Sequence, residues 1–112
     1  MIEITPHNTL YLITVIRNFT SDDIHEIIEA VEQAHAKKTL MNMERLEILT
    51  SSAIGLLISL YNNLKEIQVQ IAVTGLNRNN LHLFSLSKLD TLFTVLGSVE
   101  EGIEALSSPS NH

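Results

Sequence analysis

Three neighbouring hydroxyl side chains, those of Thr50, Ser51 and Ser52, stand in the middle of the chain. They follow an apolar run with strand character and precede an amphipathic run with helical spacing, so we expect them at a helix N-terminus. Such an end has unpaired backbone N–H groups and the positive end of the helix dipole, and it accommodates the charge of about −1.5 to −2 that a phosphoryl group brings. A phosphate on this cluster would change the surface of the protein more than its fold.

The same cluster also has a purely structural interpretation. Ser and Thr are among the preferred N-cap residues, because their side-chain oxygens accept hydrogen bonds from the unpaired amides of the first helical turn. On local sequence alone, this capping role is favoured over modification. The choice between the two depends on the residues around the cluster.

Those surrounding residues carry a family resemblance. The run from Thr39 to Gly55, which reads TLMNMERLEILTSSAIG, resembles the signature of STAS domains, the family of the bacterial anti-sigma factor antagonists. In that signature a hydrophobic strand and a short connection lead to a helix start similar to Asp-Ser-Ser-Gly-Leu-Gly. One serine of the motif is the phosphorylation site in the bacterial partner-switching members. The match puts that serine at Ser52, with Ser51 and Thr50 as the alternative hydroxyls.

The resemblance extends beyond the motif. Residues 68–77 are similar to the next strand of the family and its exit, 92–95 to its last strand, and 98–106 to its C-terminal helix. The resemblance therefore implies one STAS-like domain over residues 1–106, followed by a flexible tail over residues 107–112.

Two positions of the motif differ from the family pattern. Thr50 stands where the motif usually opens with Asp, and Ala53 stands where a Gly usually follows the second Ser. In the N-terminal third, the Gly-x-Leu-Asp run of the family is matched only by residues 17–20, which read RNFT. The missing negative charge at position 50 bears on kinase recognition more than on the fold. A non-phosphorylated structural STAS module therefore stays open as an alternative function.

Apolar periodicity predicts alternating strands and helices. Residues 10–16 are apolar on both faces, which indicates a strand covered on each side, and 40–43 and 68–74 are further strands. Residues 20–34 form an amphipathic helix with an acidic exterior, capped by Thr20 or Ser21. This order is typical of an α/β domain with a mixed sheet and flanking helices. The resemblance adds that the helices pack mainly on one face.

The remaining helices follow capping signals. The helix that begins at the hydroxyl cluster and reaches Leu64 is apolar over much of its circumference, so it is either largely buried or offers part of its surface to a partner. Asn77 or Asn79 caps a third helix, and Ser98 forms a capping-box pattern with Glu101 for the last one.

Composition limits the function classes. A chain of 112 residues that is 45% hydrophobic supports one compact domain, and its net charge of −6 argues against nucleic-acid binding. The only adjacent basic pair, Lys37-Lys38, is better explained as a favourable charge at the end of the preceding helix. There is no cysteine, no secretory signal at the start, and no apolar run near the ~20 residues of a membrane span. We therefore expect a cytoplasmic protein without direct membrane insertion.

Residues that could support catalysis or metal binding do not form a complete set. His25 and Glu29 lie one helical turn apart, but two ligands do not complete a metal site. The sequence has no His-Glu-x-x-His spacing, no glycine-rich phosphate loop and no Gly-x-Ser-x-Gly elbow. We predict no catalytic residue, metal or cofactor, and therefore no enzyme. Met41 and Met43 are expected in the core, while Asn42 between them is a candidate to orient the hydroxyl cluster.

The leading hypothesis is a partner-switching regulatory protein that resembles anti-sigma factor antagonists. It would bind an anti-sigma factor or serine kinase while Ser52 is unmodified, be released by phosphorylation, and be restored by a phosphatase. The predicted partner-binding residues are those at the start of the helix: Thr50, Ser51, Ser52, Ala53, Ile54 and Leu57. The alternative from another class is an accessory STAS subunit of a membrane transporter for lipids, of the ABC type. The oligomeric state is left open.

Overall fold

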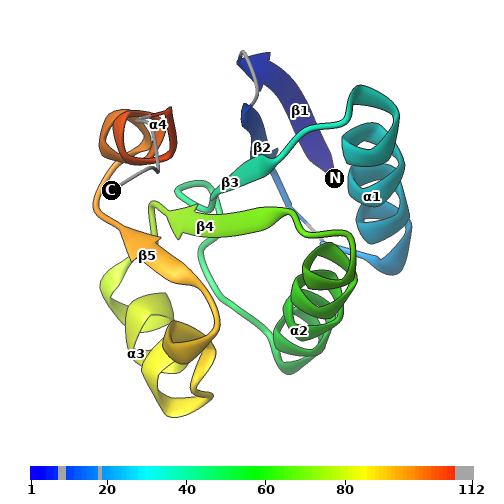
Figure 1. The fold of residues 1–112 in the computed structure, drawn as a ribbon. Coiled ribbons are helices and arrows are strands. Elements are labelled where there is room, and N and C mark those ends of the chain that lie inside the picture. Colours follow the sequence, from blue (N-terminus) through cyan, green and yellow to red (C-terminus); the bar gives the residue numbers. More distant parts are fainter. Residues whose placement is uncertain (8–9, 18, 108–112) are drawn as a thin grey trace.

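The computed structural model describes residues 1–7, 10–17 and 19–107, which form one five-stranded sheet with helices on both faces (Figure 1). Its elements follow one another along the chain as β1 (Ile2–His7), β2 (Leu10–Val15), α1 (Ser21–Ala34), β3 (Lys38–Asn42), α2 (Ser51–Glu66), β4 (Gln70–Thr74), α3 (Arg78–Leu86), the short 3-10 helix η1 (Leu89–Thr91), β5 (Thr94–Leu96) and α4 (Val99–Ser107). The predicted α/β class is confirmed.

The sheet is mixed, with the spatial order β1-β2-β3-β4-β5. β1 runs antiparallel to β2, and the other three neighbouring pairs are parallel. β2 lies between β1 and β3, and its residues Leu10, Ile13 and Val15 are buried. This interior position explains why the strand is apolar on both faces, as its sequence predicts.

The helices divide unequally between the two faces of the sheet. The larger core packs α1, α2 and α3 against one face, with Leu57, Leu60 and Phe84 fully buried at its centre. On the other face α4 covers a small cluster of Leu10, Leu40 and Ala72. Figure 1 shows α4 across the sheet from α1 and α2. The prediction of a mixed sheet with helices mainly on one face is therefore confirmed.

Most of the predicted caps form. Thr20 caps α1 in a capping box with Asp23, Asn77 caps α3, and Ser98 accepts the amide of Glu101 at the start of α4. The prediction for the lysine pair is wrong, because α1 ends at Ala34 with no basic residue in its last turn. The side chain of Lys38 instead donates from β3 to the backbone oxygen of Leu106.

Three further features differ from the prediction. β1 was not expected as a strand; its alternation of apolar and polar residues is short and ends at Pro6 and His7. The last strand begins at Thr94 rather than at residue 92, because η1 leads into Leu92 with helical backbone angles. Of the predicted tail, residue 107 ends α4 and residues 108–112 lie outside the described residues.

The close approach of α4 to the sheet depends on Gly102. A Cβ at this position would lie 2.6 Å from Cδ2 of the fully buried Leu40, so a methyl group there pushes α4 away from β3. We expect Gly102→Ala to lower the free energy of unfolding by about 1–3 kcal/mol, measured by urea denaturation.

Gly55→Ala is the matched control, because a Cβ at Gly55 in α2 meets nothing within 4 Å. It should raise stability by up to about 1 kcal/mol through helix propensity alone. Equal shifts for both variants would contradict the packing role of Gly102.

Candidate functional site

The hydroxyl cluster lies at the N-terminus of α2, and its three members have different environments. Thr50 is the N-cap, with extended backbone angles, and its Oγ1 accepts a hydrogen bond from the Ala53 amide at 3.1 Å. Ser51 and Ser52 are the first two residues of the helix, and both are exposed. Within the described part of the chain, neither serine side chain has a hydrogen-bond partner. Capping therefore falls to Thr50, while the two serines present their hydroxyls to solvent.

The predicted partner-binding residues divide between surface and core. Thr50, Ser51 and Ser52 are exposed and Ile54 is half-buried. Ala53 is only 6% exposed and Leu57 is fully buried against the sheet, so both pack α2 onto the core and are not accessible to a partner. The accessible part of the predicted set is therefore the N-terminal end of α2.

A hollow lies beside this helix end, between side chains of two loops and of α2. It has a volume of about 230 Å³ and is lined by Phe19, Leu46, Ile48, Thr50 and Ala53. Ile48 is 64% exposed, although it is a large branched hydrophobic residue. An exposed apolar side chain beside a hollow of this kind is typical of a contact surface. Sequence reasoning missed Phe19 and Ile48, because they belong to two different loops.

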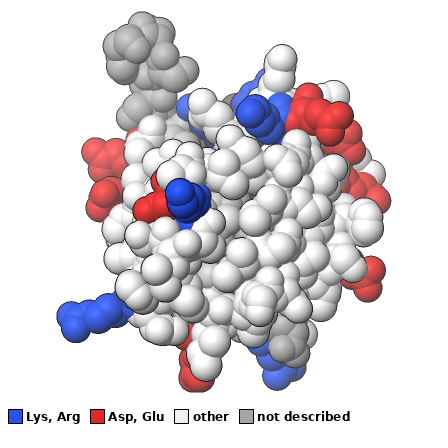
Figure 2. Space-filling model, turned by 90° about the horizontal axis from the view of Figure 1, so that it is seen from below, with Lys and Arg blue, Asp and Glu red and all other residues white. Residues whose placement is uncertain are grey.

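The face around this site is largely uncharged. α2 contains no charged residue before Lys65 in its last turn, although the whole chain has a net charge of −6. Figure 2 views the molecule from below Figure 1, where α2 and α3 lie, and most of the charged side chains in this view are at the rim. A new negative charge at Ser52 would therefore fall on a helix that carries no other charge before Lys65.

The loop before α2 is held by the connection between β4 and α3. The Met43 amide donates to the Thr74 carbonyl at 2.8 Å, which joins the ends of β3 and β4. Asn77 donates from Nδ2 to the Glu47 carbonyl at 2.9 Å. The fully buried side chain of Asn80 bonds the same loop. Asn77 was predicted only as a cap, and no role was predicted for Asn80. The polar type of Asn80 at a buried position of α3 was the available signal.

Asn42 orders the start of the same loop but not the hydroxyls. Its Oδ1 accepts from the Glu44 amide at 3.1 Å, and a Cβ on Gly75, where φ is +79°, would lie 2.9 Å from that oxygen. Met41 and Met43 are buried in the larger core beneath α2, as predicted. Side chains alternate along a strand, so Asn42 points to the opposite face of the sheet. Its predicted role as an orienter of the hydroxyl cluster is therefore not supported by the fold.

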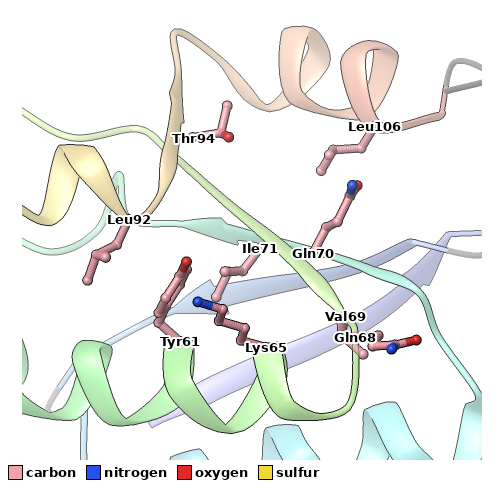
Figure 3. A pocket seen from close by; sticks show the side chains of 9 residues that line it. All are labelled: Tyr61, Lys65, Gln68, Val69, Gln70, Ile71, Leu92, Thr94 and Leu106. Carbon is pink, nitrogen blue, oxygen red and sulfur yellow. The ribbon is translucent and has the colours of Figure 1, made fainter. Parts of the chain in front are cut away.

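A second hollow, of about 420 Å³, lies at the other end of α2 (Figure 3). The hollow opens beside the start of β4, which has no strand next to it on this side because β5 pairs only with residues 72–74. Tyr61 and Lys65 rise into it from α2, with the Lys65 amine 5.9 Å from the centre of the Tyr61 ring. Because Lys65 is in the last turn of α2 and Ser52 in the first, this hollow is separate from the hydroxyl site.

Ligand sets for metals are absent from the described ranges: no three His, Asp or Glu side chains there come together as a group that could hold an ion. The helices that the structure describes are all too short or too polar to cross a bilayer.

Comparison with known proteins identifies the family. The family model for the STAS domain matches residues 2–102. Among solved structures, an RsbS variant from Moorella thermoacetica is 12% identical, with a TM-score of 0.83 and coverage of 95% of this chain and 94% of that one. The unphosphorylated form of the anti-sigma factor antagonist SpoIIAA is 16% identical, with a TM-score of 0.74 and coverage of 99% and 100%.

The phosphorylated form of the Bacillus cell fate determinant SpoIIAA is 17% identical, with a TM-score of 0.68 and coverage of 95% and 99%. No curated protein sequence matches this chain. These structural likenesses establish a common fold, and the family model covers most of the sequence. The chain belongs to the STAS domain family.

Proposed function

We propose that this STAS domain is a partner-switching regulatory protein, similar to an anti-sigma factor antagonist, whose α2 N-terminus binds an anti-sigma factor or serine kinase when Ser52 is unmodified. The observation that carries the proposal is that the three hydroxyls of the cluster have different environments. Thr50 caps the helix, so Ser51 and Ser52 are left exposed on an uncharged helix end. The existence of SpoIIAA in an unphosphorylated and a phosphorylated form supports the same class of mechanism.

The environment of each hydroxyl favours Ser52 as the modified residue over Thr50. The Thr50 oxygen already accepts the Ala53 amide, and esterification would disturb that cap. Ser52 is exposed and lies in the first turn of α2, where the unpaired amides and the helix dipole favour a phosphate. Position in the family motif separates Ser52 from Ser51, which is the alternative acceptor. The fold can therefore carry the phosphate while the surface changes.

Release of the partner follows from electrostatics. A phosphate brings a charge of about −1.5 to −2 onto a face that contains exposed Ile48 and half-buried Ile54. In a dry interface, that charge must lose its water or meet a carboxylate, and removing one ion from water without a paired counterion costs several kcal/mol. A phosphatase reverses the change. The net charge of −6 would in turn speed encounter with a basic partner surface.

The two departures from the family motif are compatible with this mechanism. Thr50 provides the same type of cap that an Asp provides, because its side-chain oxygen accepts the amide of the third helical residue. Ala53 is buried beneath the helix end. What is lost is one negative charge beside Ser52. That loss favours the second candidate function, a structural STAS module that is not phosphorylated and holds its partner constitutively.

A charge at position 52 should weaken partner binding. The partner to use is an anti-sigma factor or serine kinase encoded in the same genome, and affinity is measured by calorimetry. We expect Ser52→Asp to raise Kd at least tenfold, which corresponds to about 1.4 kcal/mol, and Ser52→Ala to leave Kd nearly unchanged.

Ser85→Asp is the charge-matched control, since Ser85 is exposed on α3. Its Kd should equal that of the wild type. If Ser52→Asp binds as tightly as this control, the switch is wrong, and a constitutive subunit, of a transporter or of another assembly, becomes the better assignment.

Gly55 provides a test in which stability and binding change in opposite directions. It lies one turn after Ser52, and the space around its missing Cβ is open in the free domain. We expect Gly55→Ala to raise the melting temperature through helix propensity, yet to weaken partner binding several-fold because the methyl group meets the partner. Differential scanning calorimetry and titration calorimetry measure the two effects. Tighter or unchanged binding would show that the partner does not pack on this face of α2.

A further inference from the structure

We infer that Asn80 is a positioning residue for the hydroxyl site: from α3, it fixes the backbone in front of Thr50 and thereby sets the orientation of Ser52 toward the kinase or partner. The functional half of this inference rests on the proposed switch at Ser52. The structural half, which is the control of the helix cap by α3, can be tested without any partner.

The side chain of Asn80 is fully buried and bonds the loop at two points. Its Oδ1 accepts from the Leu49 amide at 2.9 Å, and its Nδ2 donates to the Leu46 carbonyl at 3.0 Å. Asn77, one turn earlier, accepts the Asn80 amide at 2.8 Å and donates to the Glu47 carbonyl. Asn80 of α3 and the N-cap Asn77 therefore hold three residues of a loop that lies about thirty positions away in the sequence.

These bonds restrain a segment without regular structure. Residues 43–50 contain no helix or strand, and the Leu46 amide forms a turn bond to Met43. Leu49 is 3% exposed, so its amide requires a protein partner, and that partner is Asn80. Leu49 directly precedes Thr50. The position of the N-cap, and with it the direction of the first turn of α2, therefore depends on this bond.

The residue type matches this role better than a packing role. An amide side chain donates and accepts at once, whereas Asp only accepts and Leu does neither. Asn80 lies one turn before Phe84, which is fully buried in the core, so an apolar residue would satisfy packing at this position. A buried amide is costly unless its bonds are complete. Here both of its ends are satisfied by the loop that carries the site.

The test compares Asn80→Leu with Thr39→Val. Thr39 is also fully buried, and its hydroxyl donates one hydrogen bond to the Gln70 carbonyl at the far end of β3 from the loop. Both variants remove a buried polar group, but only one removes the contact to the site. Amide hydrogen exchange is measured by NMR on the whole chain, under conditions where each variant is folded.

We expect Asn80→Leu to accelerate exchange of the Ala53 amide, which donates to Thr50, at least tenfold more than that of core amides such as Val73. Thr39→Val should change the Ala53 amide no more than it changes the core. Equal acceleration of Ala53 and Val73 in Asn80→Leu would overturn the positioning role and leave only a general loss of stability.

A second variant keeps the inference testable if Asn80→Leu does not fold. Asn77→Asp retains the acceptor that caps α3 and removes only the donor to the Glu47 carbonyl. Asn77 is exposed, so the change is tolerated by the core. Faster exchange at Leu49 and Ala53, with unchanged exchange in α3, is the expected result. Unchanged exchange at the Leu49 and Ala53 amides would contradict the control of this loop by α3.

The functional half is read from the fraction of Ser52 that carries phosphate in the native host, measured by mass spectrometry at a temperature well below unfolding. We expect a fraction at least fivefold lower in Asn80→Leu than in Thr39→Val. Equal fractions would overturn the positioning role while the switch at Ser52 stands. A wild-type chain that never carries phosphate would overturn the switch and the functional half together, whereas the exchange result for the structural half would still stand.

Discussion

The site depends on how the backbone amides at the start of α2 and in the loop before it are satisfied. A helix N-terminus has amides without partners inside the helix, and a buried loop amide has none unless another element provides one. Here Thr50 provides the cap and Asn80 binds the last loop amide, that of Leu49. Since neither of these bonds involves a serine side chain, Ser51 and Ser52 are not required for the fold of the turn.

The separation of the capping residue Thr50 from the two exposed serines links the fold to the proposed switch. A hydroxyl that is needed for a cap cannot be modified without disturbing its helix, whereas an exposed serine in the first turn can carry a phosphate. The surrounding face of α2 is uncharged up to Lys65 and borders the hollow beside Ile48. Phosphorylation of Ser52 would therefore change the contact surface strongly while the core beneath it, centred on Leu57, stays packed.

The sequence predicted the parts of this arrangement that depend on local pattern. The apolar run of β2 indicated an interior strand, and the cluster at residues 50–52 indicated a helix start. β1 was missed because an edge strand has only a brief alternation, here Ile2 and Ile4 before Pro6. The polar type of Asn80 at a buried helix position was a signal, but its partners could not be predicted, since they are backbone atoms of a distant loop that any residue type provides. Asn42 was misjudged, since alternation along β3 turns it away from the face on which Met41 and Met43, both predicted in the core, lie.

The most direct measurement locates a phosphate within the peptide that contains residues 50–52. The protein is purified from its native host with and without phosphatase treatment, and fragmentation mass spectrometry assigns the modified residue. A phosphate on Ser52 that the phosphatase removes is the result we predict. A phosphate found only on Thr50, or none under any growth condition tested, would contradict the account and favour a constitutive STAS subunit.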